Sequence, residues 1–566
     1  MHRLLSPFGI VLVPLALALV SGCGGEDPVE PDDDLPSVLC ASVAPLTLAV
    51  GEHLVVNPAN TGGCVRVPEA AGTGAEYLLV LSSGATTENT SGPYQLRTSS
   101  PGGGATSPPV VPSVALPQSI GRRPLGAQQR FDAMLRARER ELLADPRNRA
   151  ALGPSAAVAA APPTVGDQRT FKVCTNLTCT TFGDVTATAR YVGEHTAIYL
   201  DDDVPQNDPL TTADLQDLGE TFDEFHYPID TTAFGRESDL DNNEVVIALM
   251  TDAVNALTSD CSDGRVVGYF FAGDLLTTFP NSNRSEVFYT LVPHPATSGC
   301  TAVSRQSVVN NLKPTLIHEF QHMISFNQRA LVRAGQSEQT WLNEALSHFA
   351  EELAGRLIPS SECTPTFPSC RSQYSSGNLL NVYDFMREPE DEFLTFPGSG
   401  SLDERGAAWI FLRWTLDQFA SDTILGTPTT RQLVQTTALG AANVVAATGG
   451  NFQTMVAQYL MALYLDDSGF TEPTGRLRLK SWGLRSIFLD PANQAPQGPF
   501  SGFPLVPQVS TGTFSRTGTL RSGTGTHLIL RQAASGAAID VHVRKSLAGD
   551  PLDAALQARY GIVRIQ

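Results

Sequence analysis

The chain has little positive charge. Its 566 residues include 38 lysines and arginines against 58 aspartates and glutamates, so the formal net charge is −20 and the isoelectric point is near 4.9. Nucleic acids and anionic membrane surfaces both favour clustered basic residues in their partners. The charge balance therefore argues against either as a partner, and it indicates a soluble, self-repelling exterior without identifying a substrate.

Long hydrophobic runs are also scarce. The apolar run at residues 8–20 has about a dozen residues, whereas a membrane-spanning helix needs about 20. Its basic start and short length predict a secretory signal peptide over residues 1–22. Cys23 stands where a bacterial lipoprotein signal places the cysteine that becomes acylated. We expect a lipid anchor at Cys23 as the sole membrane attachment; a plain secretory signal with a chance cysteine is the alternative.

The residues after Cys23 support export. Residues 23–37 are acidic and contain proline, a composition typical of a flexible tether. The expected location is the bacterial cell envelope, at the outer membrane or the cell surface, from which the protein could also be released.

No cysteine spacing resembles a cysteine-rich zinc ribbon. Apart from Cys23 there are eight cysteines, and an even number in an exported chain predicts disulfide bonds. Eight cysteines allow 105 pairings, but their clustering along the chain suggests sequential ones. The suggested pairs are Cys40–Cys64, Cys174–Cys179, Cys261–Cys300 and Cys363–Cys370.

The ends of the chain differ in pattern from its centre. Short apolar segments separated by Gly, Asn and Pro predict a small β module over residues 38–100, and a linker with a charged helix follows over 101–164. Residues 165–490 carry strands and then helices, and residues 491–566 return to strands. We expect an α+β protein with an N-terminal and a C-terminal β module. The N-terminal module and linker are either a propeptide or a permanent accessory region.

The segment TLIHEFQHMISF, residues 315–326, carries the clearest chemistry. Its apolar residues predict a buried helix that begins just after Pro314. On a helix, His318 and His322 share a face, and two neutral imidazoles one turn apart supply two corners of a tetrahedral zinc site. Glu319 can then reach a water molecule at the metal without binding the metal itself. This HExxH pattern also arises by chance in roughly one chain in a hundred of this length.

A second helical segment raises the odds of a metal site. Residues 341–353, WLNEALSHFAEEL, place Glu344 22 positions after His322, a separation that two antiparallel helices and a loop bridge easily. Glu344 would complete a site of two histidines and one carboxylate with an open fourth position.

These two strings resemble those of the gluzincin metallopeptidases, and most closely those of the hyicolysin-like family. The segments GRESDLD (residues 235–241) and GYFFAGD (268–274) are also similar to the region upstream of the motif in such proteins. The resemblance covers roughly residues 165–420 and leaves both ends of the chain uncovered.

The resemblance implies a thermolysin-like zinc peptidase domain within residues 165–490. It implies zinc as the cofactor, with His318, His322 and Glu344 as ligands and Glu319 as general base. Substrates would be proteins or peptides.

Two other functions compete with a zinc endopeptidase. WLNE also occurs in gluzincin aminopeptidases, but those carry an upstream Gly-x-Met-Glu-Asn element that this sequence lacks, so we expect an endopeptidase. The third hypothesis is a non-catalytic surface-binding lipoprotein with a vestigial peptidase fold. The complete set of four site residues argues against it.

One position departs from the thermolysin pattern. An aspartate is expected four residues after the ligand glutamate, and His348 stands there instead. His348 could accept a hydrogen bond, replace Glu344 as a ligand or simply pack, and Glu351 or Glu352 could orient a ligand histidine in its place. The candidates for stabilising the oxyanion are Tyr374, Tyr383 and His348.

A segment upstream of the HExxH motif has a pattern that suggests a second metal site. Asp239, Asp241 and Asn243 alternate as in calcium loops, but Glu244 occupies the EF-hand glycine position and Met250 the position of the bidentate glutamate. Calcium and a solvated turn both remain open.

Overall fold

The fold is that of a computed structural model. It describes the following residues: 40, 42–100, 125–152, 161–363, 366–398, 400–466, 468, 470, 476–546 and 549–566. The predicted signal peptide, Cys23 and the tether lie outside this set. The described part combines helices and sheets, which confirms the α+β class.

The central region begins with a six-stranded mixed sheet, whose strand order is β5-β6-β7-β8-β10-β9. Its strands are β5 (Gln168–Cys174), β6 (Phe182–Val192), β7 (Thr196–Asp201), β8 (Val246–Met250), β9 (Gly268–Phe270) and β10 (Val287–Thr290). β7, β8 and β10 run parallel, and β8 and β10 are buried along their whole length, as expected for parallel strands covered on both faces. β9 pairs antiparallel with β10 and forms an edge of the sheet.

Helices make up most of the remaining central region. The first group is α1 (Ala127–Ala144), α2 (Pro146–Ala150), α3 (Thr212–Thr221), α4 (Tyr227–Ala233), α5 (Asp252–Ala256) and α6 (Arg305–Phe326). The second group is α7 (Thr340–Leu357), α8 (Cys370–Arg387), α9 (Leu402–Phe419), α10 (Thr429–Val434), α11 (Gly440–Thr448), α12 (Phe452–Leu465) and α13 (Leu484–Leu489).

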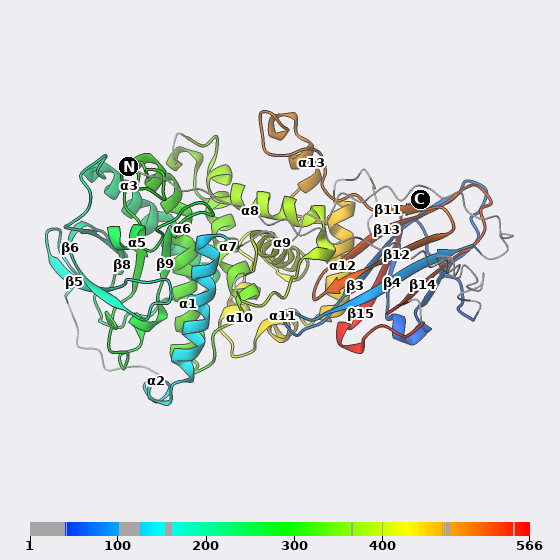
Figure 1. The fold of residues 1–566 in the computed structure, drawn as a ribbon, viewed down its shortest axis with the longest axis horizontal. Helices are drawn as coiled ribbons and strands as arrows, with labels where there is room; N and C mark the ends of the chain where they lie inside the picture. Colours follow the sequence, from blue (N-terminus) through cyan, green and yellow to red (C-terminus); the bar gives the residue numbers. More distant parts are fainter. Residues whose placement is uncertain are drawn as a thin grey trace, which may run out of the picture. The chain divides into compact units, whose positions relative to one another are not determined.

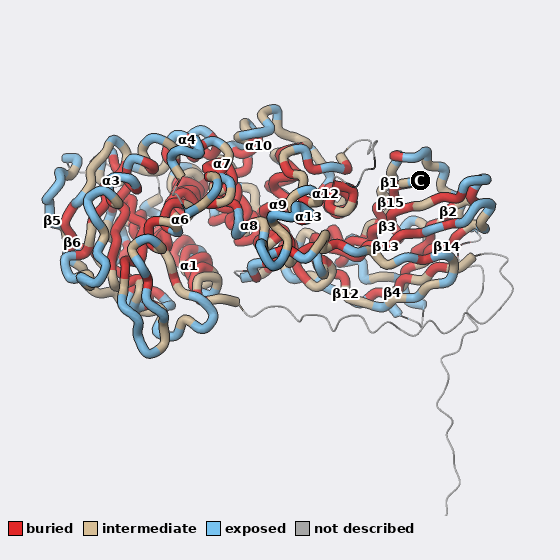
Figure 2. Tube along the Cα trace, turned by 90° about the horizontal axis from the view of Figure 1, so that it is seen from above, coloured by how far each residue is buried: buried red, intermediate tan, exposed pale blue. Residues whose placement is uncertain are grey.

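The long helices α6, α7 and α9 are buried over most of their length (Figure 2). α9 contains Trp409 and Trp414, both fully buried, so its apolar surface is that of a core helix, as its sequence predicts. Within the described residues, no helix combines the length and hydropathy needed to span a membrane.

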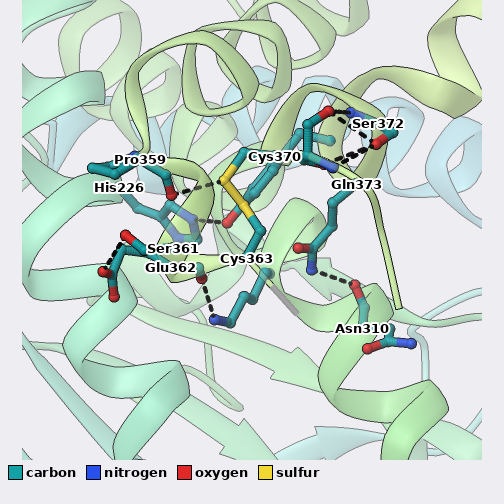
Figure 3. The surroundings of a disulfide bond; sticks show 12 residues. His226, Asn310, Pro359, Ser361, Glu362, Cys363, Cys370, Ser372 and Gln373 are labelled. Atoms are coloured by element: carbon teal, nitrogen blue, oxygen red, sulfur yellow. Dashed lines mark hydrogen bonds between the residues drawn. A yellow bond between two sulfur atoms is a disulfide. The ribbon is translucent and has the colours of Figure 1, made fainter. Parts of the chain in front are cut away.

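The helix that carries the HExxH motif begins ten positions earlier than predicted. We expected it to start after Pro314, but α6 begins at Arg305 and contains that proline. A proline inside a helix cannot donate to the carbonyl four residues before it. That carbonyl, of Asn310, instead accepts a hydrogen bond of 3.2 Å from the Gln373 side chain on α8 (Figure 3). The missing intrahelical bond is thus replaced by a tertiary one, which local sequence does not reveal.

Strands from both ends of the chain share two further sheets (Figure 1). The N-terminal strands are β1 (His53–Val56), β2 (Cys64–Val67), β3 (Ala75–Ser83) and β4 (Ser91–Ser99). The C-terminal strands are β11 (Gln508–Ser510), β12 (Phe514–Arg521), β13 (Gly525–Gln532), β14 (Ile539–Arg544) and β15 (Ala558–Arg564). The orders are β1-β15-β3-β13-β11 and β12-β4-β14-β2.

The two β modules inferred from sequence therefore interleave. β3 lies between β15 and β13, and β4 lies between β12 and β14. Alternating patterns identify strands but do not reveal which strands pair, because pairing depends on contacts between residues more than 400 positions apart in sequence.

All four suggested cysteine pairs form disulfides in the structure. The Cys363–Cys370 bond closes the connection between α7 and α8 (Figure 3). Beside it, Lys313 of α6 donates a 3.2 Å hydrogen bond to the Glu362 carbonyl. This connection therefore helps to hold α7 and α8 against the helix that carries the motif.

Candidate metal centre

The three residues predicted to bind zinc lie together. α6 carries His318 and His322, one turn apart on one face, and α7 carries Glu344. One Glu344 oxygen lies 3.7 Å from His318 Nε2, and the other lies 3.6 Å from His322 Nε2. One ligand atom from each residue lies within 4.8 Å of the other two. The Nε2 atoms thus converge on a single carboxylate, as three ligands of one ion do.

The carboxylate of Glu344 is fully buried and faces both histidines. Glu344 is 0% exposed; its Oε2 is paired with Arg405, whereas its Oε1 accepts no hydrogen bond from the described residues. Burial alone would raise the pKa of Glu344, but the charge of Arg405, 2.8 Å from Oε2, and the two histidines hold that pKa well below its usual value. A buried, ionised carboxylate facing two imidazoles is a donor set that fits zinc.

Glu319 stands between the histidines and the edge strand. Its Oε2 accepts a 2.9 Å hydrogen bond from the backbone N–H of Phe270 in β9. Burial raises the pKa of Glu319 to about 7, the range in which a carboxylate both takes and returns a proton near neutrality.

Glu351 orients His318. Its Oε1 lies 2.6 Å from His318 Nδ1 and 3.0 Å from His348 Nδ1, while its Oε2 accepts a 2.9 Å bond from Asn378. A carboxylate on Nδ1 fixes the ring with Nε2 turned toward Glu344. Glu352, the other candidate, instead accepts hydrogen bonds from two buried tryptophans.

His348 belongs to a second group that could hold a metal, together with His318 and Glu351. Both Glu351 oxygens are already engaged by His318, His348 and Asn378, whereas Oε1 of Glu344 accepts no hydrogen bond from the described residues. This difference favours Glu344 as the third ligand. His348 Nε2 is buried and has no hydrogen-bond partner among the described residues.

The surroundings of His322 are polar and come from α7. The Asn343 side-chain oxygen lies 3.2 Å from His322 Nδ1, and the Ser347 hydroxyl lies 3.1 Å from the same atom. Burial lowers the pKa of His322 well below its usual value, which keeps the ring neutral as a ligand must be. Sequence reasoning missed both residues, although their spacing of four places them on one helix face.

The two tyrosines suggested for the oxyanion are engaged elsewhere. Tyr374 hydrogen-bonds His226 at 2.8 Å, and Tyr383 accepts a 2.9 Å bond from the Ser501 backbone. Of the three candidates, His348 alone is in the cluster with His318 and Glu351.

Other residues at the site come from distant segments of the chain. The sequence around them does not indicate that they lie near the metal centre. Arg405 of α9 contacts both Glu344 and Asp132, the latter at 3.0 Å. Asp132 belongs to α1, the charged helix that the sequence analysis assigned to a linker.

No family model matches the chain. The chain is 30% identical over 173 residues to a protein named Neutral metalloprotease ShpI, from Staphylococcus hyicus. The match covers 30% of this chain and 36% of the relative, so the chain spans about a third of the length of the curated relative. This partial similarity supports a metalloprotease in general terms.

Proposed function

We propose that this chain is a zinc-dependent endopeptidase of the gluzincin type, similar to the hyicolysin-like family, exported and anchored through Cys23. The observation that carries the proposal is the convergence of His318, His322 and Glu344, in which the fully buried Glu344 carboxylate faces the Nε2 atoms of both histidines. The partial similarity to a metalloprotease supports it.

Different residues of the chain have different roles in the proposed reaction. His318, His322 and Glu344 would hold zinc, which supplies Lewis acidity by polarising a peptide carbonyl and acidifying water. Glu319 takes the proton of the attacking water and passes it to the leaving amine. Glu351 keeps His318 in its ligand orientation and also accepts from His348 Nδ1, so the imidazolium form of His348 would donate a hydrogen bond from Nε2 to the developing oxyanion.

An endopeptidase is favoured because the sequence lacks the Gly-x-Met-Glu-Asn element of gluzincin aminopeptidases. The same rate on free and N-acetylated peptides supports an endopeptidase, and strong preference for free N-termini supports an aminopeptidase.

Glu319→Gln tests the proposed chemistry. The amide keeps the size of the side chain but cannot accept the proton, so we expect casein cleavage to fall by about 10²–10⁴-fold with zinc content unchanged. Zinc is measured by atomic absorption, and cleavage is followed over long incubations so that slow rates register. A wild type that binds no zinc, or a variant that cleaves as fast as the wild type, contradicts the proposal.

We further propose a calcium ion at Asp239, Asp241 and Glu286, whose ligand atoms lie within 4.8 Å of one another. Glu286 is 1% exposed, and one of its oxygens accepts hydrogen bonds from Ser238 at 2.5 Å and Leu240 at 2.9 Å. Its other oxygen, like Oδ1 of Asp241, is buried with no hydrogen-bond partner among the described residues. Clustered carboxylate oxygens are the donors that calcium prefers.

The neighbouring residues shape this loop. Asn243, suggested as a ligand from sequence, instead orients the turn: its oxygen accepts from Val245 N at 2.9 Å, and its amide donates to Asp241 at 3.1 Å. Arg169 lies 3.6 Å from the same Asp241 carboxylate and partly offsets its charge. Glu286, just before β10, replaces Asn243 in the ligand set.

Calcium added to protein dialysed free of it should raise the melting temperature by several degrees. A ligand at about 100 times its Kd stabilises the folded state by about 2.7 kcal/mol. Glu286→Gln should lose most of this shift, and Glu244→Gln, at an exposed acid of the same loop, should retain it. Zinc content is checked in parallel. An equal shift in Glu286→Gln and wild type would show that calcium acts elsewhere.

A further inference from the structure

We propose that α1 is an autoinhibitory cover, which occupies the place of the substrate backbone along β9 and must move before a peptide can enter. This inference rests on the proposed peptidase function, since it concerns regulation of the same site. Four sets of contacts carry it.

The first set is a pair of hydrogen bonds at the start of the edge strand. The Gln128 side-chain oxygen accepts a 2.7 Å hydrogen bond from Val267 N, and its amide donates a 2.9 Å bond to the Gly268 carbonyl. The Val267 carbonyl bonds Leu291 N on the β10 side, so the Gly268 carbonyl faces the free edge of β9, where an extended peptide would pair. Because Phe270 of the same strand binds Glu319, a peptide paired with β9 would lie beside the general base.

The second set is apolar. Phe131 is 1% exposed and packs edge-on against Tyr269 of β9, with ring centroids 5.0 Å apart. Leu135, Leu142 and Leu143 of α1 are also buried. Buried side chains of this kind hold a helix against its neighbours, so α1 is docked over most of its length.

The third set is electrostatic and reaches the proposed zinc ligands. Asp132 of α1 lies 3.0 Å from Arg405, which also contacts Glu344 at 2.8 Å. α1 is thus linked through Arg405 to a proposed zinc ligand.

The fourth set is at the far end of the helix. Arg140 donates to the Thr340 hydroxyl at the start of α7, at 3.4 Å, and Arg149 of α2 donates to the Ala334 carbonyl at 3.4 Å. α1 and α2 therefore bridge from the edge of the sheet to the helix that carries Glu344.

Access to the site is restricted accordingly. The exposed fractions of His318, Glu319, His322 and Glu344 are 9%, 5%, 3% and 0%. A peptidase must bring a peptide bond into contact with its general base, and the described arrangement, with α1 in place, leaves little surface for that contact.

The interleaved β-strands limit how the cover can be released. Removing everything before residue 165, as a conventional propeptide is removed, would also take β1 to β4 out of the two sheets that they share with the C-terminal strands. Release must therefore act on α1 alone, by displacement of the helix or by cuts on either side of it.

The test uses the full chain and weakens only the contacts with β9. Gln128→Ala removes the two hydrogen bonds, and Gln128→Ala/Phe131→Ala also removes the aromatic contact. Glu141→Ala is the matched control, because Glu141 is exposed and pairs with Arg138 on the same helix. The readouts are casein cleavage, affinity for a peptide hydroxamate, hydrogen exchange of the β9 amides, zinc content and melting temperature.

We expect the double variant to cleave casein at least about tenfold faster, because a weaker contact shifts the closed–open equilibrium toward the open state. Its hydroxamate affinity and β9 exchange should rise in parallel at unchanged zinc content, with smaller changes in Gln128→Ala and none in Glu141→Ala. If the double variant has a lower melting temperature than the wild type or loses zinc, Gln128→Ala alone is used to test the inference, with the same readouts.

Two outcomes separate this inference from the proposed function. If zinc is bound and basal cleavage depends on Glu319, but β9 exchange rises with no gain in hydroxamate affinity or cleavage, α1 is structural and the inference fails. If the variants expose β9 and bind hydroxamate more tightly yet no variant cleaves peptides, the cover stands and the peptidase proposal fails.

Discussion

A chain carrying Glu344→Gln is expected to lose the proposed zinc ion and the proposed peptidase activity together. Glu344 supplies the only carboxylate that faces the Nε2 atoms of both His318 and His322 among the described residues, and an amide oxygen is a weaker, uncharged ligand. Loss of an orienting partner outside the ligand set lowers metal affinity by about 10–100-fold, and loss of a ligand should exceed that. Zinc content after dialysis and casein cleavage measure both effects.

Comparison with Glu351→Gln sharpens this prediction. Glu351 touches His318 through Nδ1 and is not a ligand in this assignment, so its variant should keep part of its zinc at raised concentrations of the metal. The alternative cluster of His318, His348 and Glu351 makes the opposite prediction. Zinc retained in Glu344→Gln but lost in both His348→Ala and Glu351→Gln would assign the metal to that cluster.

Deletion of residues 38–100 is expected to abolish folding rather than to mature the protein. β3 lies inside the five-stranded sheet, and Leu78, Leu79, Val80 and Leu81 are each 0% exposed. Truncating one such side chain costs about 2–5 kcal/mol. The sum over four of them is comparable to the whole stability of a typical domain, about 5–15 kcal/mol, before the lost strand pairings are included.

The deletion variant should accumulate as insoluble protein, or as soluble protein without a cooperative urea transition. The matched control is the intact chain carrying Glu69→Ala, at an exposed site between β2 and β3, which should unfold as the wild type does. A soluble deletion variant with a wild-type melting curve and zinc content would show that the N-terminal strands are dispensable, and would revive their role as a removable propeptide.

Local spacing was sufficient for the parts of the site that lie on single helices. His318 and His322 share a face because they are four residues apart on a helix, and Glu344 falls within a helix whose pattern is evident. The α+β class and the cysteine pairs followed from equally local patterns. The predicted start of α6 was wrong because Pro314 lies inside the helix. The carbonyl that this proline leaves without an intrahelical bond is bonded by Gln373 of another helix.

The remaining features depend on contacts between distant segments. Glu351, rather than Glu352, orients His318 because of how α7 is rotated against α6 and α9. Glu286 joins Asp239 and Asp241 because β10 runs beside β8.

The sequence by itself determined which residues could bind a metal and on which helices they lie, since helical periodicity is a local property. Only the tertiary structure decided that the terminal strands interleave in the same two sheets, and that α1 lies along β9 beside the metal centre. These arrangements arise from the burial of apolar and polar groups between segments far apart in the chain, and no local pattern records which segments will meet.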